Sequence, residues 1–531
     1  MKAIVSCILF SVCVSATAQF TRRDSLQGGN RPERSCYDVL RYDLNITLDP
    51  DKRFISGYND ITFKTVNPTS RIQLDLFPNM NVDSIVLDKK KLTYKRDEGA
   101  VFIEVPNLET QTDNTLRFYY SGNPLVAKNA PWDGGFVFSK DRNGKHWIAT
   151  AVQGTGASLW YPVKDCQWDE PDRGARISVA VPDGLMNVSN GKLLGTEKLK
   201  GYTRWNWEVV NPINNYNISL NIGDYVLVED RHNDLELQYW VLRGNEEKAR
   251  KHFVDVKPLL TCFEEKFGKY PFTEDSFKLV ETPFLGMEHQ SAIAYGNQYR
   301  KGYLGTDPSG TGIGLRFDYI VVHEAGHEWF GNSITSEDIA DMWIHEGFTT
   351  YAETVFIECL YGYDEAMRYI NGQKMLIAND KPVIGEYGVN YDGSIDMYYK
   401  GSLMINTIRH IINDDSKWWT MLNKFATDFR HKIVKTEDVV SFFNRESGIN
   451  LTPVFDQYLR TTQIPELVIE EGKGVIRYKW DNVISQFNMP VDIAINSEKK
   501  RITPTTTWQE LKVSRKNSPE ITVFTNRFLI R

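Results

Sequence analysis

The sequence predicts a multidomain α+β protein with a β-rich segment, a mostly helical segment and a small second β segment, in that order. Three observations support this: period-two alternation up to about residue 231, helical periodicity over most of 318–460, and strand patterns after about Ile464. A chain of 531 residues has room for roughly three or four domains. We expect them at residues 30–231, 232–463 and 464–531, behind a short leader.

The first 18 residues have the pattern of a secretory signal peptide. Lys2 supplies the charge, Ala3 to Val14 is a short apolar run, and Ala16-Thr17-Ala18 fits the small-residue cleavage rule. The run is too short to span a bilayer, and no later segment approaches 18 uninterrupted apolar residues. We therefore expect cleavage after Ala18, a periplasmic or secreted protein, and no transmembrane segment in the mature chain.

The number of cysteines and the net charge exclude several classes of protein. Removal of the signal would leave Cys36, Cys166, Cys262 and Cys359. These are too few for a disulfide scaffold, and none lie in a Cys-x-x-Cys pair that would suggest a sulfur-rich metal site. Buried free thiols are the default expectation, with a Cys36–Cys166 bridge as the alternative in an oxidising compartment. The net charge of −7 argues against a nucleic-acid partner.

The β-rich segment is predicted from alternation of apolar and polar residues. Residues 42–48 and 72–76 both alternate with period two, and Gly, Asn, Asp and Pro punctuate such runs as far as about Asp224. After Ile464, residues 475–480 alternate again, as do Val491, Ile493 and Ile495 with the residues between them. The last part of the chain is therefore expected to be a small β-sandwich.

The mostly helical segment is predicted to contain a helix at its start and a glycine-rich loop before the main helical region. Asn245 is expected to cap a helix that Gly268 closes, with Pro258 kinking or dividing it. The glycine-rich stretch 302–316 is expected to be a loop. Its Gly310-Thr311-Gly312-Ile313-Gly314 run lacks the Gly-Lys-Ser/Thr ending of a phosphate loop, so it predicts no nucleotide site.

The most specific chemical signal is His323-Glu324-Ala325-Gly326-His327, followed by Glu346. Residues four apart share one face of a helix, so both imidazoles can reach one Zn²⁺ ion, and Glu346 can be the third ligand. Three protein ligands leave a fourth position for water, whose proton Glu324 can accept. An amphipathic helix with two histidines by chance is the alternative; a random match is expected roughly once in a hundred such chains. We therefore predict one catalytic Zn²⁺ per chain.

With these residues in place, the chain resembles the alanyl aminopeptidase (aminopeptidase N) family of gluzincin metallopeptidases over most of its mature length. Beside the zinc helix and Trp343-Ile344-His345-Glu346-Gly347-Phe348, it carries Leu285-Gly286-Met287-Glu288-His289, similar to the exopeptidase motif Gly-x-Met-Glu-Asn, and Tyr398-Tyr399-Lys400-Gly401, similar to Tyr-x-Lys-Gly. Gln153, upstream of Asp169-Glu170-Pro171, is a weaker match. The resemblance implies a saddle-shaped N-terminal β domain and a thermolysin-like zinc domain.

The same resemblance implies a role for each matching residue. His323, His327 and Glu346 would bind zinc, and Glu324 would be the general base. Glu288 and Gln153, with the adjoining Gly286 and Met287, would bind the substrate and hold its free α-ammonium, and Tyr398 would stabilise the oxyanion. A carboxylate in a dry cleft suits an ammonium, and a phenol can donate to a developing oxyanion. Glu353 returns to the helix face of Glu346, where it either binds the far nitrogen of a ligand histidine or is solvated.

The chain also departs from the family pattern. Leu285 takes the place of the first glycine of the exopeptidase motif, and His289 and His345 replace the usual asparagines. We expect His345 to be a hydrogen-bonding neighbour and not a fourth ligand, because a closed site could not activate water. The chain ends too soon after Glu346 for the large C-terminal helical domain of the family, so we expect a more open cleft.

These observations favour a zinc aminopeptidase that removes N-terminal residues from peptides. A zinc endopeptidase is the alternative among peptidases, although Glu288 argues against it. An epoxide hydrolase of the leukotriene type shares the motifs, but a protein of the cell envelope would rarely meet that lipid. A catalytically inactive peptide-binding protein is disfavoured because Glu324, Tyr398 and the three ligands are all intact. Side-chain preference and oligomeric state do not follow from the sequence.

Overall fold

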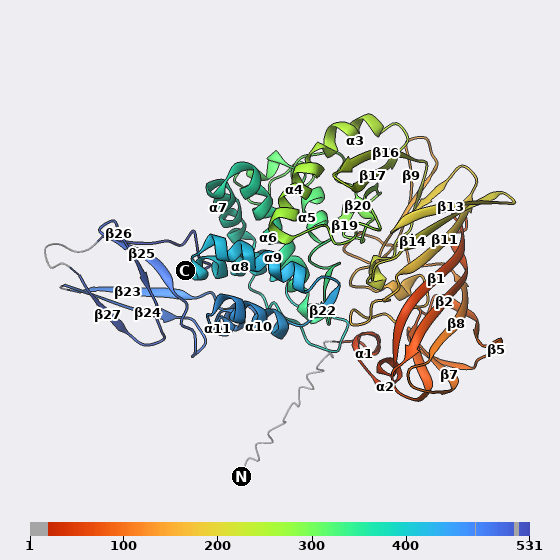
Figure 1. Cartoon of the computed structure of the whole chain (residues 1–531), viewed down its shortest axis with the longest axis horizontal. Coiled ribbons are helices and arrows are strands. Elements are labelled where there is room, and N and C mark those ends of the chain that lie inside the picture. The colour runs from red at the N-terminus through yellow and green to blue at the C-terminus, as the bar shows by residue number, and fades with distance from the viewer. Residues whose placement is uncertain (1–19, 473, 514–519) are drawn as a thin grey trace, which may run out of the picture.

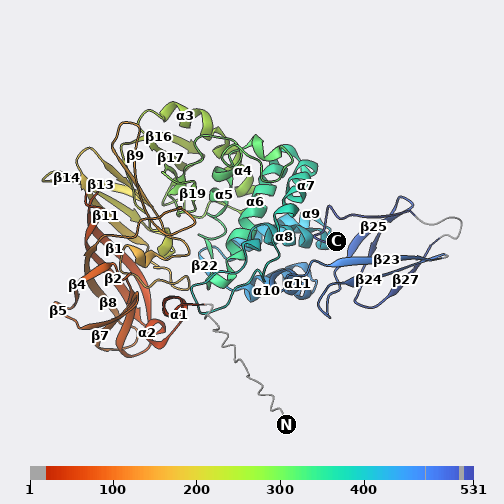
Figure 2. The ribbon, with the colours of Figure 1, turned by 180° about the vertical axis from the view of Figure 1, so that it is seen from behind.

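The computed structural model describes residues 20–472, 474–513 and 520–531. The predicted signal peptide, with Cys7 and Cys13, lies outside these residues. Figure 1 shows large β-sheets at one end of the molecule, a helical body in the middle and two small sheets at the other end, and the view from behind in Figure 2 shows the same order. The predicted multidomain α+β class is confirmed. None of the helices in the described ranges is long and apolar enough to cross a membrane.

The largest sheet belongs to the N-terminal part and contains eight strands. In sheet order they are β13 (Lys192–Leu199), β14 (Tyr202–Val209), β11 (Ala175–Pro182), β1 (Tyr37–Asp49), β2 (Phe54–Thr65), β8 (Asp113–Gly122), β4 (Met80–Leu87) and β5 (Lys90–Lys91). The alternation in β1 buries Tyr42, Leu44 and Ile46 on one face, as period-two patterning predicts. The first strand is central: it pairs antiparallel with β2 and parallel with β11.

Two smaller sheets and two short helices complete this part. The three-stranded sheet is formed by β3 (Thr69–Asp75), β7 (Ala100–Leu108) and β6 (Tyr94–Asp97). The four-stranded sheet is formed by β12 (Met186–Val188), β15 (Asn221–Gly223), β10 (His146–Ala151) and β9 (Gly135–Lys140). The helices are α1 (Arg22–Gly28) and α2 (Pro32–Ser35), and the 3-10 turns are η1 (Ala157–Leu159) and η2 (Asn215–Asn217).

A five-stranded sheet joins the N-terminal part to the helical body. Its strands are β16 (Tyr225–His232), β17 (Leu235–Leu242), β18 (Phe277–Glu281), β20 (Ile293–Tyr295) and, at one edge, β19 (Gly286–Met287). Leu279 and Ile293 belong to the core of the helical body, whereas their neighbours Val280 and Ala294 belong to the N-terminal core. Successive side chains of a strand point to opposite faces, so this sheet lies between the two cores and brings β19 to their junction. The predicted boundaries at 231/232 and 463/464 stay predictions.

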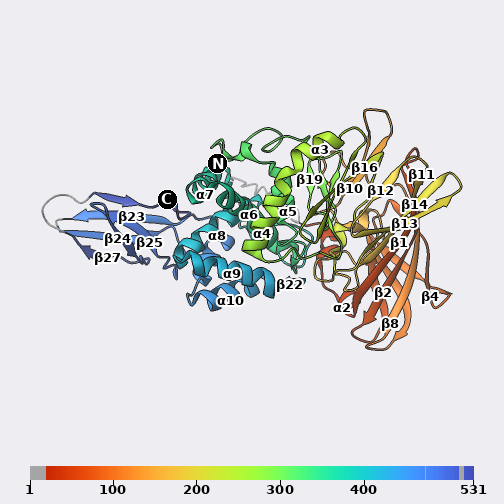
Figure 3. The same cartoon turned by 45° about the horizontal axis from the view of Figure 1, so that its top comes forward.

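Helices dominate the middle of the chain. They are α3 (Glu246–His252), α4 (Val256–Phe267), α5 (Tyr319–Gly326), α6 (Trp343–Tyr361), α7 (Tyr363–Gly372), α8 (Tyr399–Ile412), α9 (Asp415–Asp428), α10 (Thr436–Ser447) and α11 (Thr452–Arg460), with 3-10 turns η3 (Phe253–Asp255), η4 (Ile313–Arg316), η5 (Ile339–Asp341), η6 (Gln373–Leu376) and η7 (Ile395–Met397). The parallel pair of β21 (Ile334–Ser336) and β22 (Lys432–Val434) interrupts them. Figure 3 shows α4, α5, α6 and α8 grouped between the terminal sheets.

Two expectations about the helix at 245–268 need revision. The helix is divided, but at η3, and Pro258 lies in the first turn of α4, where a missing N–H costs little. The Asn245 side chain does not cap α3; it donates to Glu281 at 2.8 Å instead. Gly268 does end α4, with a φ of 86°. The loop 302–316 is confirmed apart from the short turn η4.

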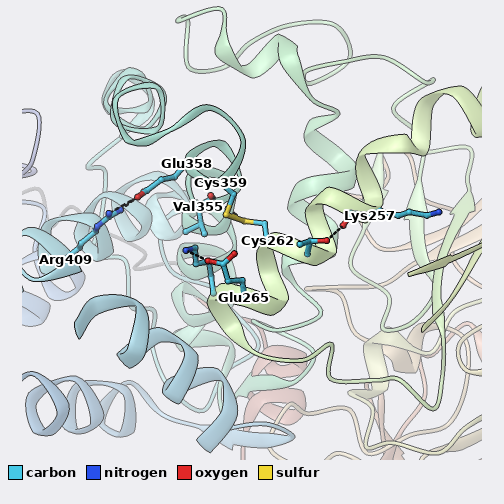
Figure 4. Close-up of a disulfide and its surroundings, with 9 residues drawn as sticks. Lys257, Cys262, Glu265, Val355, Glu358, Cys359 and Arg409 are labelled. Atoms are coloured by element: carbon cyan, nitrogen blue, oxygen red, sulfur yellow. Dashed lines mark hydrogen bonds and ion pairs between the residues drawn. A yellow bond between two sulfur atoms is a disulfide. The ribbon is translucent and has the colours of Figure 1, made fainter. Parts of the chain in front are cut away.

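The expectation of free thiols is wrong for Cys262 and Cys359, which form a disulfide between α4 and α6 (Figure 4). The two cysteines are 97 residues apart in sequence, and their Cα atoms are 6.1 Å apart. The alternative of a Cys36–Cys166 bridge is also wrong, because both of these side chains are free and buried. No spacing pattern in the sequence indicates which helices cross, so the pairing could not be predicted.

The C-terminal residues form two small antiparallel sheets, in agreement with the predicted β segment. One contains β23 (Glu466–Gly472), β24 (Val475–Asp481) and β27 (Gln509–Lys512); the other contains β26 (Glu498–Ile502), β25 (Val491–Ile495) and β28 (Ile521–Val523). Their buried residues, such as Trp480 and Ile493, are continuous with the core of the helical body. Arg501 also donates to the carbonyls of His410 and Ile411 at the end of α8.

Candidate metal centre

Helix α5 presents two histidines on one face. The helix begins because the Asp318 side chain accepts hydrogen bonds from the N–H groups of Ile320 and Val321, which caps its first turn. His323 and His327 then lie one turn apart, and their Nε2 atoms are 3.3 Å from each other. The His323 ring is also stacked on Tyr319, with the ring planes inclined by only 12°. The helix therefore presents two imidazole nitrogens to one point, as its spacing predicts.

Glu346, from the first turn of α6, completes a buried three-residue cluster. Its Oε2 lies 3.5 Å from Nε2 of His323 and 3.2 Å from Nε2 of His327. Donors about 2.0–2.1 Å from a tetrahedral Zn²⁺ ion would be about 3.3 Å from one another, close to these separations. Glu346 Oε2 is fully buried and has no hydrogen-bond partner among the described residues. This set of donors fits zinc.

Contacts on the far side of each histidine fix its ring. His323 Nδ1 lies 2.7 Å from Glu353 Oε1, and His327 Nδ1 lies 2.9 Å from the carbonyl oxygen of Phe330. In each neutral ring Nδ1 then carries the proton, which leaves Nε2 free to bind metal. Glu353 is fully buried, so the alternative that it is a solvated carboxylate is wrong.

Glu324 lies between the two ligand histidines on α5 and reaches the same cavity. Burial raises the pKa of its carboxyl group to about 7, and a bound cation would lower it again. The strand β19 passes very close to it. A Cβ atom added to Gly286 would lie 3.0 Å from Glu324 Oε1 and 2.6 Å from Ile320 Cγ2, so only glycine fits there.

Tyr398 is the residue before α8, and it also lines the cavity. Its ring centroid is 6.0 Å from that of His323. The position depends on a close crossing of α8 and α6: a Cβ on Gly401 would lie 3.1 Å from Cα of Gly347. Because Gly347 follows Glu346, this glycine pair sets the start of α8 beside the third ligand. The glycine of the Tyr-x-Lys-Gly motif therefore allows the two helices to approach closely.

Glu288 and Gln153 come together although 135 residues separate them in the sequence. The Gln153 side-chain amide donates to Oε1 of Glu288, and the hydroxyl of Tyr216 donates to the same oxygen at 3.0 Å. No described residue donates to Oε2 of Glu288. The carboxylate is almost completely buried, and one of its oxygens remains available in the cavity.

The two histidines that depart from the family pattern lie apart from the metal cluster. His345 is fully buried, and its Nε2 accepts a hydrogen bond from the N–H of Ser336 at 2.8 Å. Burial lowers the pKa of both His345 and His289 to about 3, so both rings are neutral. His289 is fully buried and has no hydrogen-bond partner among the described residues. Leu285 is partly buried and lines the cavity.

A single cavity of about 580 Å³ collects these side chains at the junction of the N-terminal part and the helical body. All of the residues predicted to be functional line it: Gln153, Gly286, Met287, Glu288, His323, Glu324, His327, Glu346 and Tyr398. Sequence reasoning missed several others that line it, including Tyr216, Tyr319 and Trp132. The Asn214-Asn215-Tyr216-Asn217 run was visible in the sequence, but no motif separated it from an ordinary polar turn.

Comparison with known proteins identifies the family of this chain. The model of the peptidase M1 N-terminal domain matches residues 39–216, and that of the peptidase family M1 domain matches residues 253–458. The two matches are in order and together cover most of the chain. The chain belongs to peptidase family M1, and zinc is the metal of this family's His-His-Glu site.

Individual relatives are distant. Aminopeptidase B of Mus musculus is 24% identical over 321 residues, covering 56% of this chain and 47% of that protein. Aminopeptidase N of Lactobacillus helveticus is 24% identical over 400 residues, covering 66% and 44%. The chain thus spans about half the length of these relatives. An M1 zinc metallopeptidase from Deinococcus radiodurans has the same fold, with a TM-score of 0.68 at 19% identity over 81% of this chain and 95% of that one.

Proposed function

We propose that this protein is a zinc-dependent aminopeptidase that hydrolyses the N-terminal peptide bond of peptides. The observation that supports this most directly is the position of Glu288. Its free carboxylate oxygen lies in the same cavity as the metal ligands and Glu324, where it can pair with the α-ammonium of a bound peptide. An anchored ammonium limits cleavage to the first bond, because the chain cannot extend past Glu288.

The other residues have complementary roles in this proposal. When bound, zinc would polarise the scissile carbonyl and acidify a water molecule. Glu324 would accept the proton of that water and pass it to the departing amine, as a general base and then a general acid. Tyr398 would donate a hydrogen bond to the carbonyl oxygen as negative charge develops on it.

The amide of Gln153 and the edge strand β19 would orient the substrate. Gln153 donates its N–H to Glu288, which leaves its own Oε1 as an acceptor for the ammonium. Strand β19 pairs with β20 on one side only, so the backbone of Gly286 and Met287 offers an open edge to an extended peptide. The missing side chain of Gly286 brings that edge close to Glu324.

The test compares aminoacyl fluorogenic amides with their N-acetylated forms, with and without a chelator. Wild-type protein should cleave only the free amines, and the chelator should abolish turnover. Glu288→Ala should lose roughly 2–5 kcal/mol of transition-state stabilisation on free amines, because the ammonium is left unpaired in a partly dry cleft. Equal cleavage of free and acetylated substrates would replace this proposal with the endopeptidase alternative.

We also propose that the protein acts outside the cytosol. The predicted signal peptide and the Cys262–Cys359 disulfide support this, because disulfides persist in oxidising compartments. N-terminal sequencing of protein recovered from the periplasm or medium should give a start at or near Gln19. Recovery of protein that begins at Met1 from the cytosol would contradict the proposal.

A further inference from the structure

Glu288 is held by side chains of the N-terminal part as well as by its own loop. Tyr216, in the turn η2, donates its hydroxyl proton to Glu288 Oε1 at 3.0 Å. The tyrosine is buried, 5% exposed, and it lines the cavity. Because Gln153 and Tyr216 both donate to Oε1, Oε2 is the oxygen left for a substrate ammonium. Tyr216 thereby acts together with Gln153 in leaving Oε2 as the available oxygen of the carboxylate.

The next residue of the same turn holds the main chain of Glu288 through one intermediate. Asn217 Nδ2 donates to Asn332 Oδ1 at 2.8 Å, and Asn332 Nδ2 donates to the carbonyl oxygen of Glu288 at 2.7 Å. The N–H of Asn332 donates in turn to the carbonyl oxygen of His327 at 3.0 Å. Asn217 and Asn332 are both at most 1% exposed. A short chain of hydrogen bonds therefore fixes Glu288 relative to a metal ligand.

The loop after Glu288 is restrained on both sides. Ser291 has a left-handed φ of 53°, a strained conformation for a residue other than glycine. Its hydroxyl accepts from the N–H of Gly191, in the N-terminal part, at 2.9 Å, and its own N–H donates to Glu328 Oε1, just past the zinc helix, at 2.9 Å. Strain of this kind persists only where surrounding contacts hold it in place.

We propose that the turn η2 completes the amine-recognition site: Tyr216 orients the carboxylate of Glu288, and Asn217, acting through Asn332, positions its main chain. This inference rests on the proposed aminopeptidase function. According to this inference, side chains of the N-terminal part set the distance between the ammonium-binding carboxylate and the metal. That distance determines which peptide bond is presented for cleavage. Tyr216 touches the binding group directly, whereas Asn217 is a positioning residue.

The test uses a pair of zinc-binding inhibitors, an aminoacyl hydroxamate and its des-amino analogue. Their affinity ratio, measured by calorimetry on zinc-loaded protein, reports ammonium recognition separately from metal binding. Tyr216→Phe should reduce the ratio by roughly 10–100-fold, because a hydrogen bond to a charged group is lost. Asn217→Ala should reduce it by roughly 2–10-fold, since its effect is indirect. Affinity for the des-amino compound and zinc content should stay at wild-type values.

Two matched variants control for loss of a buried hydrogen bond. Tyr225→Phe removes a buried hydroxyl that donates to the carbonyl of Glu281 at 2.8 Å, and Asn221→Ala removes a buried amide that donates to the carbonyl of Val188 at 3.2 Å. Both should keep the wild-type ratio. Tyr216→Phe removes a single oxygen, so it can carry the test alone if Asn217→Ala does not fold.

The outcomes separate this inference from the function on which it rests. If Tyr216→Phe and Asn217→Ala both keep the wild-type affinity ratio, this inference is wrong and the proposed aminopeptidase function stands. An equal loss of affinity for both inhibitors would also overturn the inference, because that result would indicate damage to the metal centre. A wild-type protein that binds both compounds equally would contradict the proposed aminopeptidase and this inference with it.

Discussion

Nδ1 of His323 lies 2.7 Å from Oε1 of Glu353, and Glu353 in turn accepts the hydroxyl proton of Tyr369 at 2.7 Å through its other oxygen. All three side chains are buried. The contact sets the tautomer of a ligand histidine and increases the electron density on its metal-binding nitrogen. Glu353 belongs to the same helix as the ligand Glu346, so a single helix supplies both a ligand and the partner of another ligand.

Glu353→Gln should therefore weaken zinc binding by roughly 10–100-fold, because a neutral amide stabilises the imidazole less than a carboxylate does. Competition against a chelator of known affinity would measure the change. Glu358→Gln is a control that should leave zinc affinity unaltered, because Glu358 is a partly buried residue of α6 that pairs with Arg409 and does not touch the metal cluster. Unchanged zinc affinity in Glu353→Gln would mean that the contact has no role at the metal.

Glu324→Gln should keep one zinc per chain and lose nearly all turnover. The three ligands remain, but the proton acceptor is gone, a change worth roughly 10²–10⁴-fold in rate. Metal analysis and single-turnover kinetics on the same preparation would check both parts. Loss of zinc from this variant would assign Glu324 a structural role at the site instead.

Tyr398→Phe should lower kcat by roughly 10²–10³-fold with little change in KM, because the phenol acts only once charge has built up on the carbonyl oxygen. Steady-state kinetics over a full range of substrate concentration would separate the two constants. Tyr399→Phe, the adjacent residue at the first position of α8, is the matched control and should retain most activity. An effect confined to KM would make Tyr398 a binding residue.

Removal of the Cys262–Cys359 disulfide should destabilise the helical body. The bridge closes a 97-residue separation between α4 and α6, and bridges of this kind contribute about 2–4 kcal/mol. The double variant Cys262→Ser/Cys359→Ser should have a lower Tm than wild type in thermal unfolding, and a reductant should lower the Tm of wild type only. A wild-type Tm that does not respond to reductant in the unfolding scan would argue against the bridge.

Much of the fold was predictable because it depends on local periodicity. The alternation in residues 42–48 predicts a strand with one buried face, and β1 buries Tyr42, Leu44 and Ile46 in this way. The helix at 245–268 was predicted less well. Asn is a residue type that often caps the start of a helix, but the side chain of Asn245 donates a hydrogen bond to Glu281 instead. Helix propensities do not take account of such a distant partner.

The metal site was also predictable, because its information is local. His323 and His327 share a helix face through their spacing alone, and Glu346 follows close enough in the sequence to meet them. The partners that hold Glu288 were not predictable: Tyr216 and Asn332 bond to it directly and Asn217 acts through Asn332, and these hydrogen bonds join segments up to 115 residues apart. Such contacts leave no periodic trace in the sequence.

By itself, then, the sequence determined the class of fold, the zinc ligands and the residues available for acid–base chemistry, because helical and strand spacing act over a few residues. Only the tertiary structure decided which oxygen of Glu288 remains free, which helices the disulfide joins, and why Gly286 and Gly401 lie in close contact with neighbouring elements. Those features arise where separate elements come within van der Waals or hydrogen-bonding distance, and that proximity is set by the packing of the whole core.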